Sequence, residues 1–124
     1  MKHLLSILLF FLIVPVAHAQ LPQVELKDLQ GKSINTSKLN NEGKPFIISF
    51  FATWCKPCLR ELKAINEVYE DWQEETGVKL VAVSIDEGQN TDRVKPLMDA
   101  LGLEYEVLLD PNGDFKRAMN VNMI

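Results

Sequence analysis

A strand-like pattern passes into a helix-like pattern across one short segment, Ala52-Thr53-Trp54-Cys55-Lys56-Pro57-Cys58. Before it, Pro45 to Phe51 is a continuous apolar run that is rich in β-branched and aromatic residues, which is typical of a strand buried on both faces. After it, apolar residues recur every three or four positions as far as Thr76, and Gly77 follows. This pattern predicts an amphipathic helix that ends at the glycine. The two cysteines therefore lie where a buried strand leads into a helix.

The rest of the chain alternates between the same two periods. Val24 to Leu29 and Ser33 to Asn35 predict a small hairpin, with Gly31 taking the positive φ of its turn. The later predicted elements are a buried strand over Val78 to Ile85, a helix from Thr91 to about Leu101, a strand over Tyr105 to Leu109 and a short helix over Asp114 to Met119. Pro96 lies inside the second helix and predicts a kink or a late start there. Alternating strands and helices predict one α/β domain, with a parallel-containing sheet and helices on its faces.

The first nineteen residues have the three parts of a secretory signal peptide. Lys2 begins the segment, an apolar run extends from Leu4 to Val14, and Ala17-His18-Ala19 fits the small-x-small cleavage pattern. An uncleaved membrane anchor is the alternative, but the run is shorter than the ~20 apolar residues that span a bilayer. We expect residues 1–19 to be removed, the domain to cover residues 20–124, and the protein to be periplasmic.

Composition excludes several classes of function. The net charge is −4 for the whole chain and −5 once Lys2 is removed, and no basic cluster offers a nucleic-acid site. Both histidines, His3 and His18, leave with the signal peptide, so the mature chain has no imidazole for Ser-His-Asp or Cys-His catalysis or for a His-rich metal site. Export places the two cysteines in an oxidising compartment, where disulfide chemistry is possible.

The position of the two cysteines predicts their chemistry. Cys55 falls at the cap or first turn of the helix, where free amide groups and the positive end of the helix dipole stabilise a thiolate. Cys58 lies one turn further on, within bridging reach. Pro57 suits the first helical turn, and Lys56 adds positive charge. We predict that Cys55 is the nucleophile and that Cys58 resolves the resulting mixed disulfide.

Two alternatives to a redox dithiol follow from the same cysteines. Structural zinc takes four ligands, and the mature chain has no third cysteine and no histidine, so half a zinc site is disfavoured. An inert structural disulfide would close such a short loop that it would stabilise the fold very little. The redox interpretation requires neither a metal nor another cofactor.

Trp54-Cys55-Lys56-Pro57-Cys58 after a Phe-rich strand resembles the active site of the thioredoxin superfamily. More narrowly, the chain is similar to exported TlpA/ResA-like thiol–disulfide oxidoreductases over nearly all of Val24 to Ile124. The hairpin segment Asp28 to Lys32, the approach Phe50 to Trp54 and the extra helix–strand unit at Thr91 to Leu109 carry this narrower similarity. The resemblance implies a thioredoxin-like fold with an N-terminal β-hairpin and an inserted helix–strand unit.

The same resemblance implies a function. Proteins of this group exchange disulfides with exported thiol proteins through a W-C-x-P-C dithiol, and the reductase direction is favoured. Electrons would come from a membrane-bound donor. The substrates would be exported proteins such as apocytochromes, which places the activity in cytochrome c maturation or in periplasmic redox homeostasis.

Two further positions near the cysteines can be compared one by one with those of the family. Where cytoplasmic thioredoxins have a buried Asp six residues before the first cysteine, this chain has Ser49. The ResA-like group instead resembles C-x-x-C-x-x-E, and Glu61 stands at that place. A partly buried Glu61 would have a raised pKa and would exchange a proton with Cys58. The alternative is an acidic residue in water that is favoured near the start of the helix by its dipole.

The two tryptophans have different expectations. Trp54 is either a partly exposed cover and partner contact for the disulfide or ordinary packing at the strand end. Trp72 falls on the apolar stripe of the helix and is expected in the core. No required role is assigned to Lys56, although it supports the site through its charge.

The chain stops one residue before the place where the family has a cis proline, which is followed by two strands and a final helix. Without them, the strand over Phe46 to Phe51 would have an open, apolar edge. We therefore expect an incomplete domain, either a truncated form or a gene fragment, of marginal stability and weak activity. A strand swapped between two chains is the competing account.

Two other functions compete with disulfide exchange. The first is a non-catalytic thioredoxin-fold binding module that contacts partners through its apolar edge. The second is a peroxiredoxin-like thiol peroxidase, whose reactive cysteine typically lies in a T-x-x-C setting with an Arg elsewhere. Thr53-Trp54-Cys55 does not have that spacing, and the paired cysteines favour exchange.

Overall fold

The computed structural model describes residues 20–124, and the predicted signal peptide over residues 1–19 lies outside the described residues. Five strands form one mixed sheet in the order β2-β1-β5-β4-β3. The strands are β1 (Glu25–Asp28), β2 (Ser33–Asn35), β3 (Phe46–Phe51), β4 (Lys79–Ser84) and β5 (Glu106–Leu109). β3, β4 and β5 run parallel, and β1 pairs antiparallel with both β2 and β5. The predicted N-terminal hairpin and parallel-containing sheet are both present.

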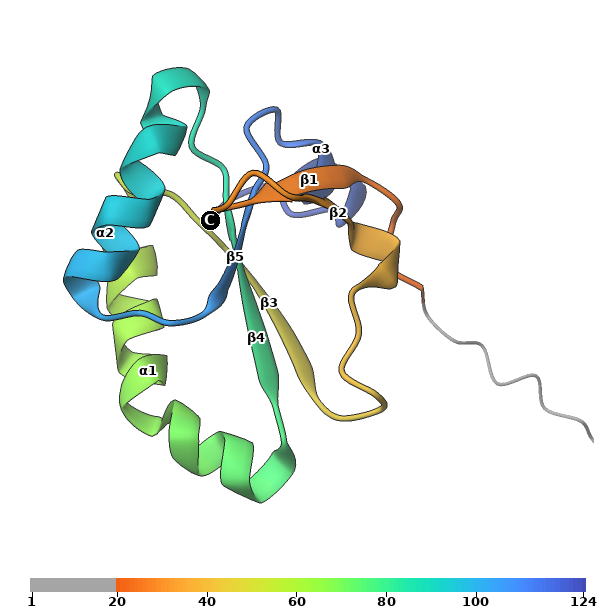
Figure 1. Cartoon of the computed structure of the whole chain (residues 1–124), viewed down its shortest axis with the longest axis vertical. Coiled ribbons are helices and arrows are strands. Elements are labelled where there is room, and N and C mark those ends of the chain that lie inside the picture. Colours follow the sequence, from red (N-terminus) through yellow and green to blue (C-terminus); the bar gives the residue numbers. More distant parts are fainter. Residues whose placement is uncertain (1–19) are drawn as a thin grey trace, which may run out of the picture.

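Three α-helices cover the two faces of this sheet. They are α1 (Lys56–Thr76), α2 (Val94–Leu101) and α3 (Asp114–Ala118). Short 3-10 helices occupy Thr36–Lys38 and Gly88–Arg93. In Figure 1, α1 and α2 lie on one side of the sheet, and the short α3 lies on the other side. None of the helices formed by residues 20–124 combines the length and the hydropathy of a membrane span.

Two apolar clusters fill the space between the sheet and its helices. The larger one lies under α1 and α2 and is centred on Phe51, Leu62, Leu80, Val94 and Met98. The smaller one lies on the α3 side and is centred on Leu26, Val81, Val83, Leu108 and Phe115. β4 contributes to both clusters because its successive side chains point to opposite faces. The buried strand predicted over Val78 to Ile85 is therefore present as β4 over Lys79–Ser84, and it is buried on both sides.

Local sequence explains where the elements begin and end. Gly77 ends α1 with φ +69°, a conformation that costs glycine little. Pro96 is the third residue of α2, where its missing amide has no helical partner to lose, and a 3-10 segment precedes the helix. The late start predicted from Pro96 is therefore confirmed.

Trp72 departs from the expected core position, because it is 39% exposed. An α-helix turns about 100° per residue, so Trp72 lies about 80° around α1 from the fully buried Leu62. Tyr69 lies closer to the line through Leu62 and fills the space against the sheet instead. The apolar stripe of α1 is therefore wider than the part of the helix that the other described residues bury.

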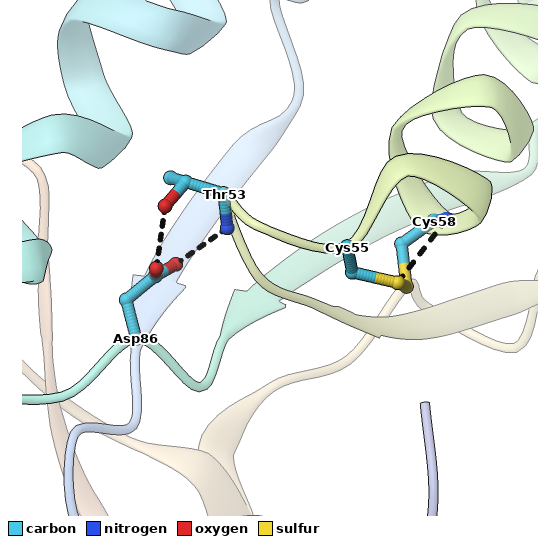
Figure 2. The surroundings of a disulfide bond; sticks show 4 residues. All are labelled: Thr53, Cys55, Cys58 and Asp86. Atoms are coloured by element: carbon cyan, nitrogen blue, oxygen red, sulfur yellow. Dashed lines mark hydrogen bonds between the residues drawn. A yellow bond between two sulfur atoms is a disulfide. The ribbon is translucent and has the colours of Figure 1, made fainter.

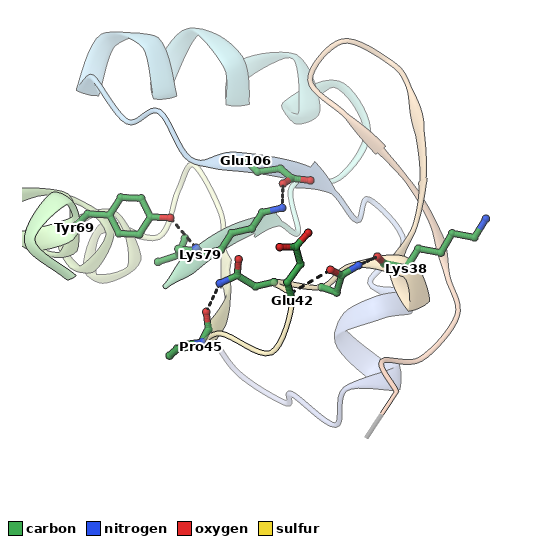
Figure 3. A network of polar contacts seen from close by, with 9 residues as sticks. Lys38, Glu42, Pro45, Tyr69, Lys79 and Glu106 are labelled. Carbon is green, nitrogen blue, oxygen red and sulfur yellow. Dashed lines mark hydrogen bonds and ion pairs between the residues drawn. The ribbon is translucent and has the colours of Figure 1, made fainter. Parts of the chain in front are cut away.

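The amino ends of the parallel strands carry a polar network (Figure 3). Lys79 at the start of β4 pairs with Glu106 at the start of β5 at 2.8 Å. The Tyr69 hydroxyl of α1 accepts a hydrogen bond from the Leu80 amide at 2.8 Å. These contacts fix α1 and the strands at the end of the sheet that is remote from the cysteines.

Candidate active site

The two cysteines lie at the carboxyl end of β3, where the chain enters α1. Phe51 ends β3, and the turn that follows is closed by the Cys55 amide, which donates to the Ala52 carbonyl at 3.0 Å. Cys55 is the N-cap of α1, with an extended backbone at φ −90° and ψ 92°. The sequence predicted Cys55 at the cap or in the first turn, and the structure places it at the cap.

Cys55 and Cys58 are joined by a disulfide across the first helical turn, with their Cα atoms 5.3 Å apart (Figure 2). The Cys58 amide donates to the Cys55 sulfur at 3.4 Å, as an N-cap side chain requires. The same hydrogen bond would stabilise a negative charge on that sulfur after the bridge opens. Reduction of the disulfide would therefore leave a thiolate on Cys55 that the Cys58 amide stabilises.

The surroundings of the helix start favour a thiolate. The first turn of α1 contains no acidic residue, and Pro57 occupies a position at which a missing amide costs little. Lys56 is exposed and adds a positive charge to the positive end of the helix dipole. The helix dipole and the Lys56 charge each lower the free energy of a sulfur anion at Cys55 relative to that of the thiol, whereas Pro57 only suits the start of the helix.

Exposure differs among the site residues. Trp54 is 63% exposed, which favours its role as a cover or partner contact over packing at the strand end. Cys55 is 8% exposed, whereas Cys58 is half-buried. In the oxidised form the predicted nucleophile is thus the less exposed of the two cysteines.

A cleft of about 360 Å³ borders Cys58. Ser49 of β3 and Glu61 of α1 line it together with Ile47, Ile48, Phe50, Pro57, Val121, Met123 and Ile124. The sequence predicted that Glu61 lies on the same side of α1 as the thiols, and the shared cleft agrees with that placement. Glu61 is exposed, however, so the partial burial on which its raised pKa was to depend is not found. Its proton exchange with Cys58 stays a prediction.

Sequence reasoning missed one residue of the site, Asp86. Its carboxylate is fully buried and accepts hydrogen bonds from the amide and the hydroxyl of Thr53, two residues before Cys55 (Figure 2). The available indication was topological: Asp86 directly follows a predicted parallel strand, and the carboxyl ends of parallel strands meet at one edge of a sheet. No group of three or more His, Cys, Asp and Glu side chains within residues 20–124 is placed to hold a metal ion.

Comparison with known families identifies the chain. A family model described as AhpC/TSA family matches residues 17–123. The chain belongs to the AhpC/TSA family. Among solved structures, a thioredoxin-like protein from Porphyromonas gingivalis is 73% identical, with a TM-score of 0.75, over 86% of this chain and 70% of that one. The thioredoxin-like fold predicted from the sequence is therefore confirmed.

Curated relatives of the chain carry a name from disulfide chemistry, and further solved structures share its fold. "Thiol-disulfide oxidoreductase ResA" of Bacillus thuringiensis is 38% identical over 90 residues, which cover 72% of this chain and 49% of that protein. StoA from Bacillus subtilis is 27% identical, with a TM-score of 0.62, over 83% of this chain and 75% of StoA. The predicted similarity to ResA-like proteins is confirmed. The chain spans about half the length of the curated relatives that it matches.

Proposed function

We propose that this AhpC/TSA-family chain is a thiol–disulfide oxidoreductase that works through Cys55 and Cys58. The observation that carries the proposal is the bridge itself: it closes across the first turn of α1, with the Cys55 sulfur at the N-cap accepting the Cys58 amide. The ResA name of the curated relatives supports the same chemistry. No cofactor is needed, because the dithiol is the redox group.

The reaction cycle follows from thiol–disulfide exchange. In the reduced chain, the Cys55 thiolate attacks one sulfur of a substrate disulfide, which forms a mixed disulfide and releases the other substrate sulfur as a thiolate. Cys58, once deprotonated, attacks the Cys55 sulfur and releases the second substrate thiolate. The Cys55–Cys58 bridge forms, and the substrate has gained two electrons. A reduced donor dithiol returns the two electrons to the bridge.

Side chains around the pair supply the remaining tasks. Glu61 borders the same cleft as Cys58 and would take its proton before the second attack. Trp54, with its indole exposed beside Cys55, would contact the incoming polypeptide. Lys56 and Pro57 support the helix start at which the thiolate forms.

The setting of the reaction is part of the same proposal. The signal-peptide pattern of residues 1–19 supports export to the periplasm, where disulfides form and persist. The substrates would then be exported thiol proteins, apocytochromes among them, and a membrane-bound thiol donor would keep the pair reduced. Maturation of cytochrome c and general periplasmic redox homeostasis are the two roles that fit.

Trapping of the mixed disulfide tests the proposed roles of the cysteines. When the Cys58→Ser chain meets glutathione disulfide, we expect the Cys55 thiolate to bond to one glutathione and to release the other as a thiolate. The mixed disulfide should accumulate, because no second sulfur in the chain resolves it. In a dye-quenched glutathione disulfide assay, Cys55→Ser should lower the rate about a hundredfold or more, because a serine hydroxyl is not ionised at neutral pH. Mass spectrometry of trapped peptides identifies the attacking sulfur. If glutathione attaches to Cys58 of the Cys55→Ser chain faster than to Cys55 of the Cys58→Ser chain, Cys58 is the nucleophile and Cys55 is the resolving cysteine.

The two rival functions predict different results with the same variants. A binding module would capture partners equally well after Cys55→Ser. A thiol peroxidase would consume hydrogen peroxide through Cys55. The structure offers little for peroxide activation at Thr53, because its hydroxyl is committed to Asp86 at 2.6 Å. We therefore expect no peroxide consumption above that of a free thiol.

A further inference from the structure

Asp86 carries a buried carboxylate that forms no ion pair with any cation in the described part of the chain. It lies two residues beyond β4 and is 0% exposed. None of the ion pairs found within residues 20–124 includes it. A buried carboxylate is tolerated only where hydrogen-bond donors replace its hydration. The identity of those donors shows what the residue does.

The donors come from the loop before Cys55 and from the end of β4. Thr53 donates its amide to Asp86 Oδ2 at 2.9 Å and its hydroxyl to Oδ1 at 2.6 Å. The Ser84 hydroxyl donates to Oδ2 at 2.7 Å and accepts the Asp86 amide at 3.1 Å. The Ser84 contacts fix the carboxylate on β4, so its two bonds to Thr53 attach the loop to the sheet.

Thr53 belongs to the turn that places the dithiol. The turn is closed by the Cys55 amide on the Ala52 carbonyl, and the residue before it, Phe51, accepts the Ile85 amide at 2.8 Å. Asp86 is thus the only side chain among the described residues that hydrogen-bonds to the loop between β3 and Cys55. A turn held at both ends fixes the direction in which Cys55 presents its sulfur to Cys58.

We propose that Asp86 is a positioning residue for the Cys55–Cys58 pair, acting through its two hydrogen bonds to Thr53. Two sulfurs held in bonding geometry have a high effective concentration, which favours the disulfide over the dithiol. Freeing Thr53 lets Cys55 move away from Cys58 in the reduced chain. The equilibrium constant for closing the bridge then falls. The relevance of this effect to catalysis rests on the proposed function, but the equilibrium itself does not.

The test is the redox equilibrium of the full chain with glutathione. Two glutathione thiols reduce the Cys55–Cys58 bridge to two thiols and form one glutathione disulfide, and alkylation followed by mass spectrometry counts both forms. In Asp86→Ala we expect the constant for bridge formation to fall about tenfold, equivalent to a potential about 30 mV higher. Because the cause is geometric, the same factor is expected from about pH 5 to about pH 8, across which thiol ionisation changes.

Two further variants separate positioning from a general loss of stability. Asp110 is equally buried and caps α3 by accepting the Phe115 and Lys116 amides. Asp110→Ala should therefore lower the melting temperature without changing the redox constant. Asp86→Asn keeps a carbonyl for the Thr53 amide, and its amide group can donate to the Thr53 hydroxyl. We expect it to retain the wild-type constant within about threefold.

The outcomes that overturn the inference are specific. It fails if folded Asp86→Ala keeps the wild-type constant, if Asp110→Ala lowers the constant equally, or if Asp86→Asn behaves as Asp86→Ala. Should Asp86→Ala not fold, Thr53→Val removes only the hydroxyl bond and should lower the constant about threefold; no change there would also overturn it. No substrate protein takes part in the glutathione equilibrium. A chain that fails to reduce protein substrates would therefore refute the proposed function, but it would not change the measured effect of Asp86 on bridge formation.

Discussion

Cys55 owes its chemistry to its place in the backbone. As the N-cap of α1, its sulfur accepts the Cys58 amide at 3.4 Å, and it faces the positive end of a 21-residue helix. A cysteine in the middle of a strand would have neither this amide hydrogen bond nor the helix dipole to stabilise its thiolate. The spacing of Cys55 and Cys58 after an apolar run was enough to predict this placement. The hydrogen-bond geometry itself required the structure.

Glu61 is the residue whose role is least determined by its surroundings. It is exposed, yet it borders the same cleft as Cys58. If it takes the proton of Cys58, Glu61→Gln should lower the turnover of a dye-quenched glutathione disulfide about tenfold at neutral pH, less than a buried general base contributes. The free energy of unfolding should change little, because an exposed side chain loses few contacts.

Glu67→Gln is the matched control for this prediction. Glu67 is also an exposed carboxylate on α1, but it lies beyond the cleft that Cys58 borders. Its loss should leave turnover unchanged. Equal rates for wild type and Glu61→Gln over the neutral pH range would assign Glu61 to the solvated, dipole-favoured alternative.

Asp86 shows why part of the site escaped sequence reasoning. Its partner Thr53 is 33 positions away, and no local pattern joins the two residues. Helical spacing was enough to place Cys55, Cys58 and Glu61 near one another at the start of α1. The role of Glu61 came only from the resemblance to ResA-like proteins and stays a prediction. Contacts between the ends of neighbouring strands depend on register, which the sequence leaves open until the strand pairing is known.

Helix α1 carries the site and is joined to the sheet by two tyrosines. The Tyr105 hydroxyl donates to the Leu62 carbonyl at 2.8 Å, and the rings of Tyr69 and Tyr105 pack edge to face with centroids 5.2 Å apart. The apolar period predicted the helix and its end at Gly77, but it also assigned Trp72 to the core. Periodicity finds the buried face of a helix, whereas the width of the surface that covers it is a tertiary property.

The hydroxyl of Tyr105 makes the contact between α1 and the sheet, and with it the free energy of unfolding, dependent on pH. Burial, with a smaller contribution from Tyr69, raises the pKa of Tyr105 from 10.0 to about 12. Between pH 10 and pH 12 the unfolded chain loses the phenol proton, whereas the folded chain keeps it. The free energy of unfolding is therefore highest below pH 10 and falls as the pH rises toward 12. Tyr105→Phe should cost about 1 kcal/mol at neutral pH through the lost hydrogen bond to Leu62.

The measurement is urea unfolding of both proteins at a series of pH values. The difference in unfolding free energy between wild type and Tyr105→Phe should narrow above pH 10 and reverse sign as the pH approaches 12, because only the wild type carries this ionisation and the pKa shift outweighs a hydrogen bond of about 1 kcal/mol. Lysines titrate in the same range, but they are common to both chains and cancel in the difference. A constant difference up to pH 12 would contradict a buried, neutral phenol.

At the scale of the whole molecule, the sheet is covered unevenly. Within residues 20–124, α1 and α2 cover one face of the sheet, whereas the short α3 is the α-helix on the other face (Figure 1). Phe115 of α3 packs against Phe50 of β3 with ring centroids 5.7 Å apart. β3 is also the last strand of the sheet formed by residues 20–124, so its outer amides and carbonyls face no neighbouring strand. The open edge was expected from the resemblance to ResA-like proteins, because the strands that would flank β3 in that family follow the place where this sequence stops. The apolar run by itself predicted a strand buried on both faces, whereas most of β3 is only partly buried.

An open apolar edge is a template for pairing with another chain. We expect this 124-residue chain to associate as its concentration rises, so that the mean mass in sedimentation velocity exceeds that of one chain. Ile48→Lys places a positive charge on the edge strand and should restore the mass of one chain, because a charged residue on an edge strand opposes pairing with another strand. Val68→Lys, on α1 and 37% exposed, removes an apolar side chain away from β3 and should leave association unchanged. A mean mass that stays at one chain at every concentration, with a cooperative melt, would show that the outer edge of β3 does not recruit a partner strand.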